Sequence, residues 1–135
     1  MIFNHLMAFY HVCKLKWHVF CSIIRTNVLR KKDMKIRNVK GSSKVSGRPP
    51  QPYSSWLNYW EIKANFSLDR NQLYNCPACG KAFYPKDFDG CHVQKVSFFD
   101  RTWFIVPLCS SCNHSTKIME IGNVTMIPSP SNNID

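Results

Sequence analysis

Two pairs of cysteines constrain this chain more than any other feature. They are Cys76 with Cys79 and Cys109 with Cys112, and 29 residues separate the two pairs. Two thiolates at this spacing fit into one turn and face the same ion, with Zn–S distances of about 2.3 Å. Two such pairs fill all four positions of a tetrahedral site and leave none open for catalysis. The sequence therefore predicts one structural zinc ion that organises the second half of the chain.

Cysteine usage and the N-terminal segment bear on the cellular compartment. The chain has 7 cysteines, an odd number, whereas a secreted disulfide framework favours an even number spread along the chain. Histidines and lysines interrupt the apolar residues of 1–21, and no run approaches the roughly 20 apolar residues of a membrane span. We predict an intracellular, reducing compartment, cytoplasmic or nuclear, and no transmembrane segment.

The charge of the chain is strongly basic and unevenly distributed. Its 18 Lys and Arg against 8 Asp and Glu give +10, and all of the excess lies before residue 71. This balance favours nucleic acid or an anionic membrane surface as partner, with a non-specific basic tail as the alternative. Of the nucleic acids, we expect DNA more than RNA. The residues expected to contact phosphates are Lys35, Arg37, Lys40, Lys44 and Arg48.

Composition along the chain predicts four parts. They are a basic extension over 1–33, a basic Pro/Gly/Ser linker over 34–54, a zinc domain with a preceding helix over 55–127, and a flexible tail over 128–135. Met34 opens a more coherent stretch and is the expected true start. A basic amphipathic helix across Phe9–Arg30 is the alternative for the extension.

Local patterns predict the elements of the zinc domain. Ser54 or Ser55 can cap a helix that runs to about Ala64 and places Trp56, Tyr59 and Trp60 on one face. We expect this face to pack on the zinc domain, with base stacking as the alternative. The other predicted elements are strands at 73–74, 91–93, 103–106 and 124–127, a loop at 97–101, and a short helix from about residue 113.

This order of elements resembles the treble-clef (ββα-metal) domain of HNH endonucleases over about residues 73–120. In that family a hairpin that carries a histidine lies between the two cysteine pairs, and a helix begins at the second pair. Here the hairpin with its histidine corresponds to Gly90-Cys91-His92-Val93, and the second pair with the start of the helix corresponds to Cys109-Ser-Ser-Cys112-Asn113. The resemblance implies an α+β fold, a small zinc-stabilised treble clef with a basic N-terminal arm and a short aromatic helix. A zinc ribbon is the alternative.

The resemblance also implies a reaction. His92 would act as the general base, and Asn113 and His114 would hold a second divalent ion (Mg, Mn or Zn) that stabilises the leaving oxygen. Cys91 stands where the family has an aspartate, and Phe104 where it has an asparagine. The second ion would then be bound by Cys91, His92 or His114, or catalysis has been lost. We predict a nucleic-acid-binding zinc protein that hydrolyses phosphodiester bonds if this site is intact. The alternative is a non-catalytic module that binds nucleic acid or a protein partner.

Overall fold

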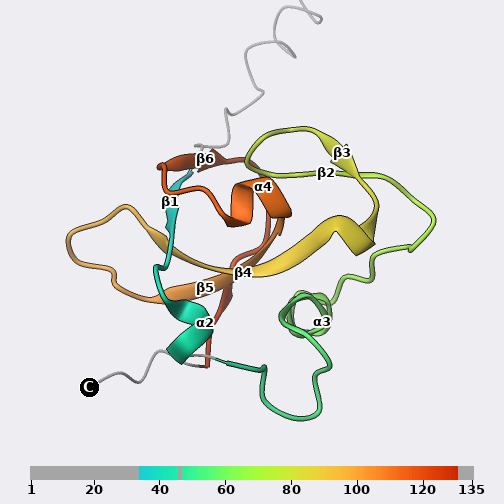
Figure 1. The fold of residues 1–135 in the computed structure, drawn as a ribbon, viewed down its shortest axis with the longest axis horizontal. Coiled ribbons are helices and arrows are strands. Elements are labelled where there is room, and N and C mark those ends of the chain that lie inside the picture. Colours follow the sequence, from blue (N-terminus) through green and yellow to red (C-terminus); the bar gives the residue numbers. More distant parts are fainter. Residues whose placement is uncertain (1–33, 46, 131–135) are drawn as a thin grey trace, which may run out of the picture. The chain divides into compact units, whose positions relative to one another are not determined.

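The computed structural model describes residues 34–45 and 47–130 of the 135-residue chain (Figure 1). The predictions for residues 1–33 and for most of the tail lie outside this part. The elements are, in order, β1 (Met34–Asn38), α2 (Ser42–Val45), α3 (Trp56–Lys63), β2 (Tyr74–Asn75), β3 (Ala82–Phe83), η1 (Pro85–Asp87), β4 (Phe88–Lys95), β5 (Trp103–Cys109), α4 (Ser110–Asn113), β6 (Met119–Ile121) and β7 (Ile127–Pro128).

An antiparallel sheet forms the centre of the described chain. Its five strands follow the order β6-β1-β4-β5-β7, and β2 and β3 form a separate two-stranded ribbon. The fold is therefore a small α+β domain, which confirms the predicted class.

The longest pairing in the sheet is the hairpin of β4 and β5. Its register sets His92 opposite Ile105 and Phe88 opposite Cys109. The predicted strands at 91–93 and 103–106 both lie within it, but β5 continues through Pro107, where we expected it to end. Since β7 pairs only with Phe104 and Ile105, β5 is an edge strand at Pro107, which is where a sheet tolerates proline.

The structure differs from the predicted linker at residues 34–38, which form β1 in the interior of the sheet. β1 pairs with β4 on one side and with β6 on the other. Only Ile36 of this strand is fully buried, while Met34, Lys35 and Arg37 are exposed. The sequence shows little apolar alternation here because hydrogen bonding to two neighbours, rather than burial of a whole face, holds the strand.

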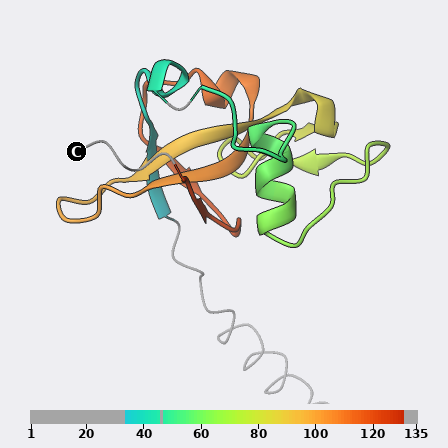
Figure 2. The same cartoon turned by 90° about the horizontal axis from the view of Figure 1, so that it is seen from below.

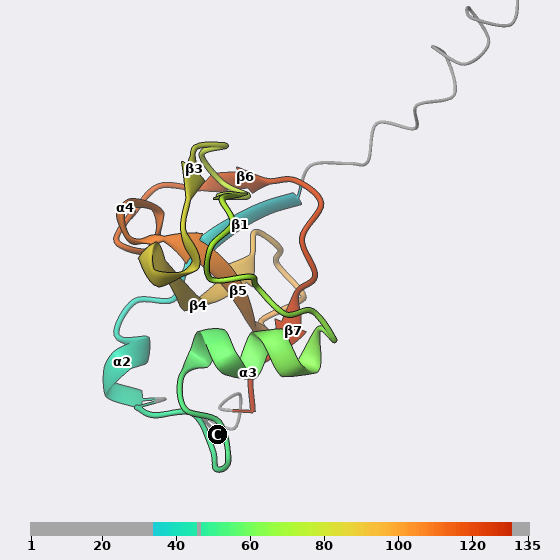
Figure 3. The same cartoon turned by 90° about the vertical axis from the view of Figure 1, so that its right-hand side faces the viewer.

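Two apolar clusters cover the two faces of the hairpin. Figures 1 and 3 show α3 on one side of β4 and β5, with the β2–β3 ribbon and α4 on the other. Val93, Val106 and Leu108 belong to the larger cluster, which includes Cys76 and Cys109. Tyr59 and Trp60 of α3 pack on Ile105 in the smaller cluster. Alternation of side chains along each strand sends neighbouring residues into different clusters.

Helix α3 confirms the predicted aromatic helix. The side chain of Ser55 accepts a hydrogen bond from the backbone N–H of Asn58 at 3.0 Å, as a helix N-cap does. The indole of Trp60 donates to the carbonyl of Thr125 at 2.8 Å, which ties the helix to the end of the described chain. None of the helices in residues 34–45 and 47–130 has the length and apolar character needed to cross a membrane.

Candidate metal centre and adjoining pockets

The sulfur atoms of Cys76, Cys79, Cys109 and Cys112 form a cluster that can hold a zinc ion. All four lie within 4.8 Å of one another, and the sulfurs of Cys79 and Cys109 are 3.8 Å apart. A tetrahedral site with Zn–S bonds of about 2.3 Å has sulfur–sulfur edges of about 3.8 Å. The donor set and its spacing therefore fit zinc.

Local backbone geometry brings the four thiols together. The first pair lies in the turn between β2 and β3, where Gly80 adopts a left-handed backbone with φ 71° and donates its N–H to the carbonyl of Cys76 at 2.8 Å. A side chain disfavours this conformation, so glycine suits the turn. The second pair stands where β5 ends at Cys109 and α4 begins. The helix therefore starts at Ser110, three residues before the predicted position.

The environment of Cys76 favours its thiolate, the form that binds metal. Burial by itself raises the pKa of this thiol. The backbone N–H groups of Cys109, Cys79 and Ala78 outweigh that effect and lower the pKa to about 7. All five cysteines of the described residues are free thiols, which is consistent with a reducing compartment.

Cys91 does not belong to the metal cluster. Its buried thiol donates to the carbonyl of Asp89 at 3.3 Å, and burial, followed by the charge of Asp89, raises its pKa. Cys91 packs in the larger apolar cluster, whereas the ring of its neighbour His92 contacts Trp56 of α3. Because their side chains point to opposite faces of β4, these two residues cannot bind one ion together. Among the residues offered for a catalytic ion, Cys91 therefore lies apart from His92.

Asn38 of β1 holds the end of α4, a role that sequence reasoning missed. Its side-chain amide lies 2.8 Å from the carbonyl oxygen of Cys112 and 2.9 Å from those of Asn113 and Ser115. The last carbonyls of a helix lack donors four residues further on, and here only that of Cys112 also accepts from the backbone N–H of Ser115, at 3.1 Å. The contact fixes the segment that carries Cys112, Asn113 and His114. No sequence signal could reveal it, since Cys112 lies 74 positions after Asn38 in the chain.

The structure brings His92, Asn113 and His114 around one cavity of about 380 Å³. We call this cavity the histidine pocket. The side chain of His114 is exposed, and its Nδ1 lies 2.8 Å from the carbonyl of Ser110. Because Nδ1 faces a carbonyl, it is the donor, and in the neutral ring the lone pair of His114 lies on Nε2. The lining residues are Val39, Gly41, Ser42, Gly47, Trp56, Gly90, Cys91, His92, Asn113 and His114.

His92 is buried on the α3 side of the sheet. The residue is 8% exposed, and its ring centroid lies 4.5 Å from that of Trp56 in an edge-on arrangement. Its Nε2 is buried and has no hydrogen-bond partner among the described residues. Burial lowers the pKa of His92 to about 4, so the imidazole is neutral near pH 7. Apolar Ile105 stands opposite it in β5, so no asparagine orients the ring there.

We expect His92 to make the stability of the domain depend on pH. Its pKa is about 4 in the folded state, against 6.5 as the ordinary value. The unfolded chain therefore binds more protons between these two values, and stability falls as the pH falls through this window. When the pH falls from about 7 to about 5, the free energy of unfolding of the wild type should decrease by about 2 kcal/mol more than that of His92→Gln. Urea unfolding at each pH measures both values. Subtracting the variant removes effects that both proteins share, such as protonation of the zinc thiolates. Parallel curves for the two proteins would contradict the prediction.

Asp89 is a further polar residue, and it directly precedes Gly90, which lines the histidine pocket. Asn113 donates its side-chain amide to the Asp89 carboxylate at 3.1 Å, which joins the end of α4 to β4. The carboxylate lies three positions before His92, whereas the family pattern places an acidic residue directly before the base. Sequence reasoning therefore passed over Asp89, although the Asp-Gly-Cys-His order was a visible signal.

A larger cavity of about 1030 Å³ adjoins the histidine pocket and shares Gly47, Trp56, Gly90 and Asn113 with it. We call it the α3 groove, because it runs along the start of α3 beside η1. Its charged lining residues are Arg48, Glu61, Arg70, Lys86 and Asp89.

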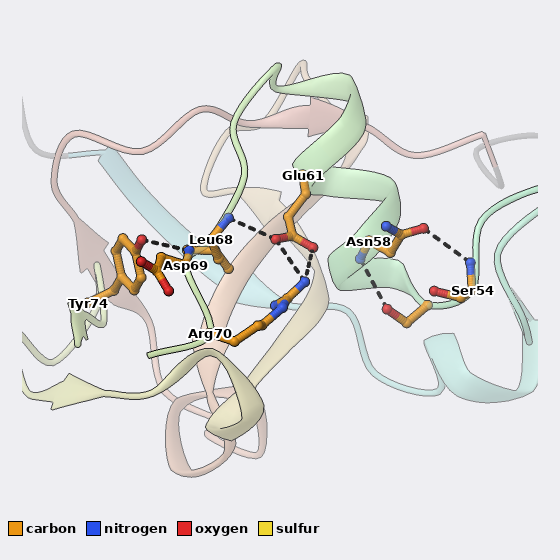
Figure 4. A network of polar contacts seen from close by, with 8 residues as sticks. Ser54, Asn58, Glu61, Leu68, Asp69, Arg70 and Tyr74 are labelled. Carbon is orange, nitrogen blue, oxygen red and sulfur yellow. Dashed lines mark hydrogen bonds and ion pairs between the residues drawn. The ribbon is translucent and has the colours of Figure 1, made fainter. Parts of the chain in front are cut away.

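Only some of the charged side chains in the α3 groove are available to a bound ligand. Figure 4 shows Glu61 of α3, whose carboxylate accepts from the backbone N–H of Leu68 at 2.9 Å. One guanidinium nitrogen of Arg70 donates to both of its oxygens, at 2.8 and 3.1 Å. Arg70 is thereby neutralised. No carboxylate of the described residues forms an ion pair with Arg48 or Lys86. These two cations remain available to an anion.

The predicted phosphate contacts do not gather at this groove. Of the five, only Arg48 lines either cavity. Lys35 and Arg37 are exposed on β1, where Lys35 pairs with Glu120 at 3.6 Å. Lys40 and Lys44 are exposed beside and within α2. Lys86 of η1 lines the α3 groove instead. Sequence analysis did not identify it, because it lies in a segment predicted as a loop.

A second metal site is not shown among the described residues. Within that part of the chain, Cys76, Cys79, Cys109 and Cys112 are the only group of three or more His, Cys, Asp or Glu side chains close enough to share an ion. Comparisons with protein-family models, with curated proteins and with solved structures found no match for this chain.

Proposed function

We propose that this chain is a zinc-stabilised nucleic-acid-binding domain, in which β2–β3, the β4–β5 hairpin and α4 form a treble clef resembling that of HNH endonucleases. The chain order of turn, hairpin and helix around the four cysteines supports the treble clef. A zinc ion at the cysteine cluster would hold the hairpin and α4 together. DNA is the preferred ligand.

The α3 groove is the observation that carries the nucleic-acid proposal. It combines Arg48 and Lys86, two cations that form no ion pair within the described part of the chain, with the amide side chains of Asn58 and Asn113. Cations and amides are the groups that contact phosphates and sugars in nucleic-acid complexes. Residues 34–130 carry 12 basic and 6 acidic residues, so the described chain itself attracts polyanions. Lys40 and Lys44 would extend the contact along the backbone of the nucleic acid.

Binding to a DNA duplex should weaken steeply with salt, and Lys86 should contribute to this dependence. For about six phosphates neutralised, log affinity should fall with log salt at a slope of about −5. Lys86→Gln should weaken binding several-fold and reduce the slope by about 1. Lys81→Gln is the matched control, because Lys81 is exposed but lines neither cavity. Fluorescence anisotropy over a salt series checks this. An absence of binding at low salt, or equal slopes for the two variants, would count against the groove.

Phosphodiester hydrolysis is the second candidate function, favoured by the convergence of His92, Asn113 and His114 on one pocket. A divalent ion beside the pocket would stabilise charge on the scissile phosphate. His114 would present the lone pair of Nε2 to it, and Asp89 would supply the oxygen that Cys91 lacks. His92, neutral near pH 7, would accept the proton of water at Nε2. Because that atom is buried beneath Trp56, substrate binding would have to displace the indole.

Cleavage of supercoiled plasmid DNA tests hydrolysis. With Mg²⁺, Mn²⁺ or Zn²⁺ added in turn, the wild type should nick the plasmid, and His92→Ala should reduce the rate by about 10²–10⁴-fold. Lys81→Gln should cleave at the wild-type rate. Equal rates for wild type and His92→Ala would exclude His92 as the base. No nicking with any of the three ions would leave the binding module as the function.

A further inference from the structure

The tip of the β4–β5 hairpin displays two adjacent aromatic side chains to solvent. Phe98 is 95% exposed and Phe99 is 99% exposed, and Val96 beside them is 42% exposed. Figures 1 and 2 show this tip extending beyond the neighbouring strands. Adjacent apolar rings that are not buried in the domain's own core are typical of a surface that binds a partner.

The loop that carries these rings is held firmly by its polar side chains. The hydroxyl of Ser97 accepts from the backbone N–H groups of Phe99 and Asp100 at 3.2 and 3.3 Å. The Asp100 carboxylate accepts from the backbone N–H of Thr102 at 3.0 Å and pairs with Lys95 at 3.1 Å. A backbone ordered in this way lowers the entropy that the loop loses when a ligand binds to both rings.

Charge at the tip selects the kind of partner. Lys95 and Asp100 neutralise each other, which leaves the exposed Arg101 beside the rings and the exposed Arg37 opposite Gln94 of β4. Flat aromatic rings next to an arginine match single-stranded nucleic acid, whose bases stack and whose phosphates are anionic.

We propose that Phe98 and Phe99 form a base-stacking tip for single-stranded nucleic acid, an inference that rests on the proposed nucleic-acid binding and deepens it. The tip lies six residues beyond His92 on the same hairpin. At about 3.3 Å per residue this is about 20 Å, a length that about six stacked nucleotides span. One strand can therefore lie along the hairpin and reach both places.

Two oligonucleotides of about 12 units test the tip. One is oligothymidine, and the other is an abasic oligomer with the same number of phosphates and therefore the same charge. The wild type should prefer oligothymidine by about 10-fold or more. The double variant Phe98→Ala/Phe99→Ala should lose this preference, while its affinity for the abasic oligomer and its salt slope stay unchanged. Ile118→Ala removes another exposed apolar side chain, 58% exposed, and should behave as the wild type.

A second double variant, Phe98→Leu/Phe99→Leu, separates stacking from simple apolar contact. It keeps apolar area but has no ring, so it should lose the preference as the alanine variant does. If it keeps the preference, or if the alanine variant does, the stacking tip is overturned. Phe-dependent binding to phosphatidylserine vesicles with no preference for oligothymidine would also overturn it, in favour of a lipid surface. A wild type that binds both oligomers equally overturns the tip alone, whereas one that binds neither overturns nucleic-acid binding as well.

Discussion

Replacing Cys109 by serine is expected to abolish zinc binding and to unfold the domain. The substitution breaks the set of four sulfurs at a residue that is 2% exposed and ends β5, directly before α4. A structural zinc ion contributes about 10–16 kcal/mol in zinc-finger peptides. Net stabilities of domains are only about 5–15 kcal/mol, so the chain cannot stay folded without this contribution. Zinc content and circular dichroism of the purified variant measure the effect.

Cys91→Ser is the matched control for this experiment. Cys91 is also buried, at 2% exposure, and it lies near the cluster without belonging to it. The control should keep one zinc ion per chain and its secondary structure, with only the modest destabilisation of a buried hydroxyl. Equal zinc content in wild type and Cys109→Ser would show that the cluster does not bind the ion.

Gly90→Ala is expected to destabilise the domain by about 3 kcal/mol or more. A Cβ at Gly90 would fall inside van der Waals contact of the backbone atoms of Trp56 and Leu57, at the first turn of α3. These backbone atoms cannot yield as a flexible side chain can, and overpacking costs about 1–3 kcal/mol and occasionally more. The variant must separate α3 from β4, which would disturb both cavities because Gly90 lines each of them.

Urea unfolding followed by tryptophan fluorescence measures this change. Gly122→Ala provides the control, because a Cβ there meets no atom within 4 Å. The free energy of unfolding of Gly122→Ala should stay within about 0.5 kcal/mol of the wild-type value. If Gly90→Ala unfolds at the wild-type midpoint, α3 does not pack on β4 as described.

Local signals in the sequence predicted the features that depend on neighbouring residues. The paired spacing of Cys76 with Cys79 identified the cluster, because two thiols in one turn need only local geometry. The capping hydroxyls of Ser54 and Ser55 predicted the start of α3 to within one residue, and Ser55 is the cap. The aromatic and β-branched run at 103–106 identified β5, whose central residues are buried on both sides.

Features that depend on distant contacts were not predictable in this way. β1 is a strand because β4 and β6 flank it, and its own sequence is basic and only Ile36 is buried. Asn38 acts on α4 across 74 positions. The pairing of Asn113 with Asp89 and the place of Lys86 in the α3 groove likewise follow from packing of η1, β4 and α4.

X-ray absorption at the zinc edge of the purified chain tests the central claim most directly, because it counts the atoms that bind the ion. One zinc ion per chain surrounded by four sulfur atoms at about 2.3 Å is the predicted result. A chain without zinc, or an ion bound by nitrogen or oxygen in place of any of these sulfurs, would contradict a structural centre made of Cys76, Cys79, Cys109 and Cys112.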